Sequence, residues 1–230
     1  MYLLGYDIGS SSVKACLVDV ETGQTIASSF FPKQEAPIRS EQSGWAEQNP
    51  QDWWTYLTEV TKAIHASDYK GQIAAIGISY QMHGLVCIDQ NKQVLRDAII
   101  WCDSRAVPYG KKAEEALGTG FCLEHMLNAP GNFTASKLSW VRENEPELFA
   151  KIWKIMLPGD YIAMRLTGEV NTTVSGLSEG VFWDFKNNSL AKELMNFYHL
   201  PETLIPAIVP TFGVQGKVNK EAAQLLGIDE

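Results

Sequence analysis

The chain has 230 residues and a formal net charge of −8, and 45% of its residues are apolar. That apolar share supplies a packed core and excludes a disordered chain. The negative charge excludes nucleic acid as a partner of the whole chain, because binding it requires clustered Lys and Arg. Small anions such as phosphates stay compatible with the charge, since backbone N–H groups hold them without positive side chains.

The 4 cysteines form no C-x-x-C pair, which argues against a zinc knuckle and against a redox pair. The N-terminal run MYLLGYDIG has no basic segment and is too short for a signal peptide. No stretch approaches the run of about 20 apolar residues that spans a bilayer. These features predict a reduced, cytoplasmic protein with no membrane partner.

Strands are predicted at residues 2–8, 13–20 and 25–31. The turns Gly9–Ser12 and Glu21–Gly23 separate them, and such short connections join neighbouring antiparallel strands. The opening is therefore a meander. It excludes a Rossmann opening, in which the first strand runs into a helix.

A helix is predicted to begin at residue 50. Asn49 is a typical N-cap, Pro50 suits the first helical position, and Asp52 suits the first turn. Apolar residues then recur at helical spacing and should form the buried stripe of this helix. The residues of the stripe are Trp53, Leu57, Val60 and Ile64.

The later part of the chain alternates strands and helices. The run at residues 73–79 is almost entirely apolar, which is typical of a buried central strand. Further strands are predicted at residues 85–88 and 94–101. Predicted helices cover residues 107–117, 135–144, 147–151, 161–166, 190–198 and 221–226, the last closed by Gly227. This order predicts one α/β domain with a mixed sheet flanked by helices.

The first turn carries candidate phosphate-binding chemistry. Asp7 ends the first strand, small residues form the turn, and Lys14 lies on the second strand. Gly and Ser let phosphate approach backbone donors closely. Lys14 suits a phosphate oxygen, and Asp7 suits a magnesium ion held through water. An ordinary hairpin with a solvated Asp and Lys explains the same residues equally well.

The segment Gly5–Lys14 resembles the first phosphate motif of the actin-like ATPases, a superfamily with a ribonuclease H-like fold. Gln81–Gly84 resembles the sugar-binding turn of the xylulokinases, which belong to the FGGY family of carbohydrate kinases. Trp101–Arg105 resembles a second substrate segment of that family. Residues 44–54, 132–140 and 157–161 also match it. The common order and spacing of these segments extend the resemblance from Tyr2 to about Glu230.

The resemblance implies the site residues and the partners, ATP with Mg²⁺ and a small ketose. Asp7 would be a catalytic residue that binds Mg²⁺ through water. The residues implied for the ATP phosphates are Gly9, Ser10, Ser11 and Lys14. Those implied for the ketose are Met82, His83, Trp101 and Asp103. The flat face of a Trp suits the C–H side of a sugar, and His and Asp suit its hydroxyls.

Several of these residues also have a plain structural interpretation. His83 fits a turn histidine, and Trp101 fits a core residue at the end of an apolar strand. Asp103 fits a surface ion pair with Arg105, which would contribute little. Asp160 is well explained as a helix N-cap. The tryptophans near residue 50 are expected to pack and not to bind ligand.

The resemblance also indicates what residues 1–230 are expected to lack. In the family, a Gly-Gly-x-Asp segment supplies the general base of phosphoryl transfer, and a C-terminal domain binds the nucleotide. The sequence contains no Gly-Gly pair, and Asp229 follows a single glycine, so Asp229 is not assigned as the base. We therefore expect an N-terminal, sugar-binding domain that is inactive alone.

Other functions stay open at this point. The sequence is compatible with a non-enzymatic sugar-binding module, with another actin-like ATPase, and with a kinase for ribulose, glycerol or another polyol. D-xylulose is the first expectation because of Gln81–Gly84. A homodimer is also compatible with the sequence, since a domain without its partner exposes apolar surface.

Overall fold

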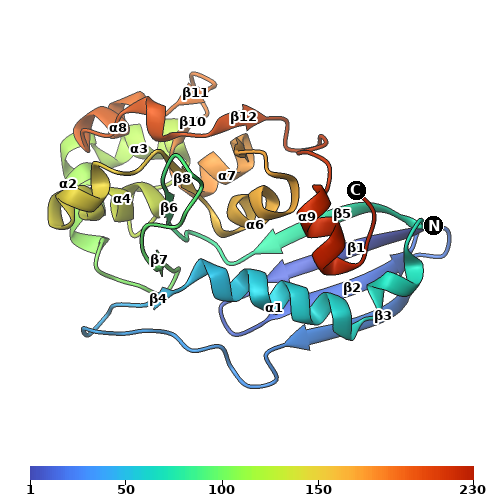
Figure 1. Cartoon of the computed structure of the whole chain (residues 1–230). Helices are drawn as coiled ribbons and strands as arrows, with labels where there is room; N and C mark the ends of the chain where they lie inside the picture. Colours follow the sequence, from blue (N-terminus) through green and yellow to red (C-terminus); the bar gives the residue numbers. More distant parts are fainter.

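The computed structural model describes residues 1–230 and is built around a four-stranded sheet of order β3-β2-β1-β5. Strands β1 (Tyr2–Ile8), β2 (Val13–Asp19) and β3 (Thr25–Phe31) form the predicted antiparallel meander. Strand β5 (Ile73–Tyr80) pairs with β1 in parallel. The sheet is therefore mixed, as predicted (Figure 1).

Helix α1 (Pro50–Ala63) runs along the sheet and covers one of its faces (Figure 1). Its start is as predicted, because the side chain of Asn49 accepts from the backbone N–H of Gln51 at 2.9 Å. The predicted stripe is buried, and Leu57 and Val60 are 0% exposed. Each such side chain contributes roughly 1.5–3 kcal/mol of hydrophobic stabilisation.

Strand β5 differs from the prediction of a buried central strand. It is an edge strand of the sheet. Residues such as Ala75, Gly77 and Ser79 are exposed, while Ile76 and Ile78 are half-buried. In this run, the isoleucines pack on one face of the sheet, and small residues leave the other face open. The sequence pattern alone does not distinguish such a strand from one that is buried on both faces.

Short strands divide the interior into two hydrophobic cores of 25 and 24 buried residues. Along β6 (Val86–Ile88), Val86 and Ile88 enter the first core, and Cys87 enters the second. Successive side chains of a strand point to opposite faces, so one strand supplies both cores. The other short strands of this wall are β4 (Glu47–Gln48), β7 (Ala98–Ile99) and β8 (Lys154–Met156). Of the strand predicted at residues 94–101, only Ala98–Ile99 is a strand in the structure, namely β7.

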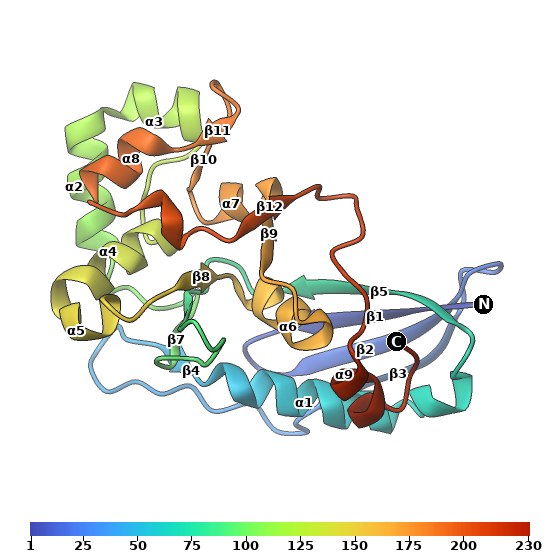
Figure 2. The ribbon, with the colours of Figure 1, turned by 45° about the horizontal axis from the view of Figure 1, so that its top comes forward.

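We name the first core, with the four-stranded sheet, the sheet body, and the second core the helical lobe; they lie side by side (Figure 1, Figure 2). The helices of the lobe are α2 (Val107–Leu117), α3 (Thr119–Met126), α4 (Thr134–Asn144), α5 (Pro146–Phe149), α7 (Val174–Glu179) and α8 (Lys192–Phe197). The sequence analysis missed α3 and α7. Both are short, and Gly120 and Gly176 within them weaken the helical pattern.

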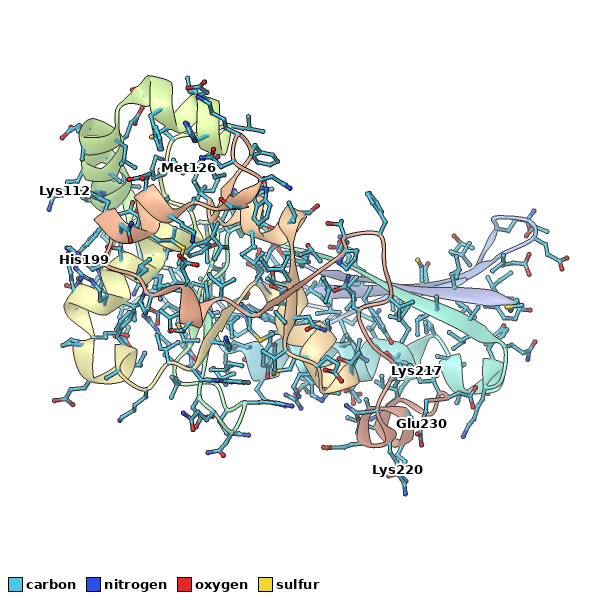
Figure 3. All side chains as sticks on the ribbon, turned by 90° about the horizontal axis from the view of Figure 1, so that it is seen from above. Lys112, Met126, His199, Lys217, Lys220 and Glu230 are labelled. Atoms are coloured by element: carbon cyan, nitrogen blue, oxygen red, sulfur yellow. The ribbon has the colours of Figure 1, made fainter.

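The last helix returns to the sheet body. Helices α6 (Pro158–Thr167) and α9 (Lys220–Leu226) both contribute to its core. Gly227 closes α9 at a φ of 72°, as predicted. Figure 3 shows Lys220 and Glu230 on this side of the molecule and Lys112 and Met126 at the other.

The remaining elements are small connections. They are β9 (Asn171–Thr173) paired with β12 (Ala207–Val209), β10 (Trp183–Asp184) paired with β11 (Ser189–Leu190), and the short 3-10 helices η1 (Ala66–Tyr69) and η2 (Glu202–Leu204). None of the helices reaches the length and apolarity that crossing a bilayer requires.

Candidate functional site

The carboxylate of Asp7 lies on the sheet face opposite α1, beside two polar partners. Lys14 lies opposite Asp7 on β2, and Ser79 lies next to it on β5. The Lys14 Nζ donates to Asp7 Oδ2 at 3.1 Å, and the Ser79 hydroxyl donates to Asp7 Oδ1 at 3.3 Å. The Asp7 side chain is 44% exposed, so its oxygens remain accessible to a ligand.

The turn after Asp7 presents free backbone donors. The N–H of Gly9 donates to the Ser12 carbonyl at 3.1 Å and closes the turn. A Cβ at Gly9 would approach that carbonyl oxygen to 2.9 Å, so the turn requires glycine. The N–H groups of Ser10, Ser11 and Ser12 donate to no protein acceptor. Such a row of unpaired donors suits a phosphate.

A hollow of about 820 Å³ lies on this face of the sheet. Asp7, Lys14 and Ser79 line it, together with Lys33. Gly5 and Gly77 form part of its floor, where the lack of side chains leaves room for a ligand. Two ammonium groups facing one hollow favour an anionic ligand.

Asp7 fits the magnesium role that the resemblance implies. No group of three or more His, Cys, Asp or Glu side chains gathers anywhere in the chain. Magnesium does not need such a group, because it keeps several waters and binds through one or two carboxylates and substrate phosphates. A single accessible carboxylate beside free phosphate donors is therefore a matching arrangement.

The Met82–Gly84 turn follows β5 and lies close to the phosphate turn. The N–H of Gln81 donates to the carbonyl of Ile8 at 2.8 Å, which ties the two turns at their bases. Met82 is 55% exposed. His83 has a φ of 60°, in the left-handed region that few non-glycine residues adopt.

The ring of His83 is held in one tautomer. Its Nδ1 lies 3.1 Å from the carbonyl oxygen of Glu179, and a carbonyl only accepts, so Nδ1 carries the proton. Burial lowers the pKa of His83 below its usual value, against the hydrogen bond to the Glu179 carbonyl, which raises it, and the charge of Lys137 lowers it further. In the neutral ring, Nε2 is therefore an acceptor, which suits a sugar hydroxyl.

Trp101 joins the predicted sugar segment to the phosphate turn. Its indole Nε1–H donates to the hydroxyl of Ser10 at 3.2 Å. The side chain is not a core residue, because Trp101 is 49% exposed. A fixed, exposed ring of this kind offers an apolar face to a ligand.

Asp103 differs from the expectation that it hydrogen-bonds a sugar. It is 0% exposed. Its Oδ2 accepts from the Ala46 N–H at 2.6 Å and from the Arg105 guanidinium at 2.7 Å, and its Oδ1 accepts from the Arg105 backbone N–H at 2.9 Å. No oxygen remains for a ligand. The pair with Arg105 is also not at the surface, so Asp103 has a structural role in holding the loop that carries Trp101.

Asp160 is not the N-cap of α6. The cap is Leu157, and Asp160 lies three residues later, with its carboxylate accepting from the Leu157 N–H at 3.3 Å. Burial raises the pKa of Asp160 to about 7, against hydrogen bonds from Thr172 and Leu157 that lower it, and the nearby Glu179 charge raises it further.

Asp229 lies far from the site. Its carboxylate accepts from the backbone N–H of Gly71, which precedes β5. Asp7 pairs with Ser79 at the other end of that strand. At a rise of about 3.3 Å per residue, the two aspartates are separated by roughly 20 Å along the strand. The geometry agrees with leaving Asp229 unassigned as the base.

Gln48 is a site residue that the sequence analysis did not identify. It is 4% exposed, and its Nε2 donates to the carbonyl of Ser10 at 2.7 Å. Its Oε1 accepts from Trp53 at 3.1 Å and from Gln81 at 3.4 Å. One buried amide thus joins α1, the phosphate turn and the base of the Met82–Gly84 turn. In the sequence, the one feature that pointed to Gln48 was its position in the run at residues 44–54, which matches the family.

Two further ionisable residues contact the Met82–Gly84 turn. Lys137 of α4 and Glu179 of α7 both hydrogen-bond the main chain of His83. Lys137 lies in the matched run at residues 132–140, yet nothing in the pattern separates it from a surface lysine. Glu179 lies in no matched run and ends a helix that the sequence did not predict.

The comparisons with known proteins agree with this geometry. The model of the FGGY family of carbohydrate kinases, N-terminal domain, matches residues 2–230. The xylulose kinase of Klebsiella pneumoniae is 33% identical over 224 residues, which are 97% of this chain and 45% of that protein. The chain thus spans about half the length of the curated relatives it matches.

Solved structures of carbohydrate kinases have the same fold as this chain. The xylulose kinase of Rhodospirillum rubrum has a TM-score of 0.89 at 27% identity and covers 100% of this chain, which corresponds to 47% of that one. The gluconate kinase of Lactobacillus acidophilus has a TM-score of 0.88 at 25% identity, over 99% of this chain and 46% of its own. These neighbours confirm the actin-like ATPase fold class. The chain belongs to the FGGY family of carbohydrate kinases and carries the N-terminal domain of that family.

Proposed function

We propose that this domain binds a ketopentose, D-xylulose first, and presents one of its hydroxyls to the terminal phosphate of ATP. The observation that carries the proposal is the contact between Trp101 and Ser10, at 3.2 Å. It brings the residues implied for the sugar next to the turn implied for the phosphates. A phosphoryl acceptor and donor must meet in this way.

On the phosphate side, three parts act together. The free N–H groups of Ser10–Ser12 hold phosphate oxygens, and Lys14 adds a positive charge. Asp7 would hold Mg²⁺ through water, and the ion would supply positive charge beside the phosphates. Gly9, which closes the turn, keeps these donors in place.

On the sugar side, Trp101 supplies a flat apolar face and His83 supplies a hydrogen-bond acceptor at Nε2. Met82 adds apolar contact next to them. A site built around such hydrogen bonds discriminates against sugars that lack the matching hydroxyl, because its part-buried polar group is then left unpaired. The xylulose kinases among the relatives support D-xylulose as the first substrate to test.

The test is sugar binding to the 230-residue chain by ligand-observed NMR. The ligands are D-xylulose, D-ribulose, D-gluconate, glycerol and D-glucose. We expect selective binding of D-xylulose. His83→Ala should weaken it about tenfold, the equivalent of one hydrogen bond to a sugar hydroxyl.

Asp229→Ala is the matched control, because Asp229 lies at the far end of the strands, and it should leave sugar binding unchanged. Stronger binding of D-gluconate or glycerol than of D-xylulose would reject D-xylulose as the substrate. Equal binding in the His83→Ala variant would reject the assigned pocket.

A further inference from the structure

Lys137 is a fully buried ammonium that forms no salt bridge. It is 0% exposed. Its Nζ donates to two main-chain carbonyl oxygens, that of His83 at 2.7 Å and that of Ile100 at 3.0 Å. Burial lowers the pKa of Lys137 to about 8, against the charges of Asp103, Cys102 and Glu179, which raise it.

Burying the Lys137 ammonium here costs free energy, because its charge loses its hydration. A methionine or leucine would occupy a similar volume without the desolvation of a charge. What only the ammonium supplies is a link between two carbonyl groups. Those groups belong to the two segments that carry the exposed sugar-side residues, since Ile100 directly precedes Trp101 and His83 directly follows Met82.

Glu179 holds the other side of His83. Its carboxylate accepts from the backbone N–H of His83, and its carbonyl faces the His83 ring. His83 is therefore held at its N–H by one ionisable residue and at its C=O by another.

The backbone of His83 explains why two contacts are needed. Its φ of 60° is unfavourable for a residue with a side chain. Such a conformation persists where the surrounding structure over-determines it, and this happens at ligand sites. Here the restraints come from α4 and α7 of the helical lobe, while the turn itself continues β5 of the sheet body.

We propose that Lys137 and Glu179 are positioning residues for the sugar: they clamp the main chain of His83 and align Met82 with Trp101. The sugar role of this clamp rests on the proposed function. The clamp itself is a feature of the main chain and is measured without any sugar.

The first experiment follows the His83 amide by NMR in the ¹⁵N-labelled chain. A proton donated to a carboxylate changes its resonance as that carboxylate gains a proton. We expect the His83 amide to titrate with Glu179, whose pKa burial raises above its usual value. Glu179→Gln keeps an acceptor oxygen in place and should abolish this component of the titration, so that only the response to the His83 ring itself is left. The same titration in Glu179→Gln, or none in the wild type, would overturn the clamp.

The second experiment measures the affinity for D-xylulose by calorimetry. Lys137→Met and Glu179→Gln should each weaken it at least tenfold. Ser139→Ala is the matched control, because Ser139 is also buried on α4 at 2% exposure, and it should bind as the wild type does. Wild-type affinity in both clamp variants would reject the positioning role.

The two experiments separate the two proposals. If Lys137→Met fails to fold, Glu179→Gln decides, because its side chain is part-exposed and its shape is kept. If the wild type binds no sugar while the His83 amide titrates as expected, the clamp stands and the proposed function falls.

Discussion

The phosphate turn and the sugar segments lie next to each other, yet they are held in different ways. The phosphate turn is a local hairpin, in which Asp7 and Lys14 are 7 residues apart and both are exposed. The Met82–Gly84 turn is held by residues 54 and 96 positions away from His83, both from the helical lobe. The side chains of the phosphate turn are therefore positioned by local sequence, and those of the Met82–Gly84 turn by tertiary packing.

The difference extends to charge. The exposed Asp7–Lys14 pair contributes on the order of 0–1 kcal/mol to stability, so its residues are free to serve a ligand. Around the sugar segments, charged groups are buried and their partners are fixed. Removing one partner there leaves an uncompensated buried charge. Substitutions at buried and at exposed groups test this contrast.

Arg105→Ala should produce the largest loss of stability. The guanidinium lies 3.7 Å from the ring centre of Trp45 and pairs with Asp103 and Glu47, each at 2.7 Å. Its removal leaves the fully buried Asp103 carboxylate without a cation. We expect the free energy of unfolding to fall by about 3–5 kcal/mol, measured by urea denaturation.

Arg39→Ala is the matched control for that experiment. Arg39 pairs with Asp97, but its side chain is 63% exposed, so the loss should stay within about 1 kcal/mol. Similar losses in the two variants would remove the contrast between exposed and buried pairs.

Asp160→Asn should change how stability depends on pH. The pKa of Asp160 is raised from 3.8 to about 7, so between these values the folded chain binds the proton and the unfolded chain does not. The protonated Asp160 therefore adds to the free energy of unfolding at low pH, and this contribution is lost as the pH rises toward 7. The asparagine variant has no such proton to lose.

Relative to the wild type, Asp160→Asn should therefore gain roughly 3 kcal/mol between pH 4.5 and pH 8, because the folded-state pKa lies about 2.5 units above pH 4.5 and each unit corresponds to about 1.4 kcal/mol. Urea unfolding at the two pH values measures this. Parallel pH dependence of the two proteins would show that the carboxylate is not protonated in the folded state near neutral pH.

Ser10→Ala should have the smallest effect on stability and a clear effect on Trp101. Loss of one exposed hydrogen bond is expected to change the free energy of unfolding by about 0.5–1 kcal/mol. The indole N–H resonance of Trp101, assigned with Trp101→Phe, should move toward the position of a water-exposed indole.

Ser11→Ala is the control for the indole experiment, because Ser11 is exposed and forms no hydrogen bond with the indole of Trp101. An equal displacement of the indole resonance in both variants would mean that Trp101 does not donate to Ser10, and the link between the two turns would be lost.

The sequence predicted the local features well. The meander, the start of α1 and the glycine that ends α9 follow from alternation, capping residues and turn chemistry, which act over a few positions. The run at residues 73–79 was assigned to the centre of the sheet because a row of Ile, Ala and Gly reads as buried, whereas its neighbours in space decide its exposure.

The site was predictable only in part, for the same reason. Ser10 lies in a recognisable turn and Lys14 lies on the strand that follows it, and the structure brings Ser10 to Trp101. Asp103 was assigned to the sugar because Trp101–Arg105 resembles a substrate segment of the family, and the structure gives both of its oxygens to protein donors. Lys137 and Glu179 act from distant helices, and no short-range pattern marks such residues.

Strand β5 leaves the sheet open to extension by a further strand. It pairs with β1 on one side only, so its outer row of main-chain donors and acceptors is not used by the sheet. An unpaired edge of this kind accepts an added strand, whether from a designed peptide or from another molecule of the same chain. The small residues Ala75 and Gly77 offer little steric protection there. This edge is therefore the place to insert charge when the domain is engineered against aggregation.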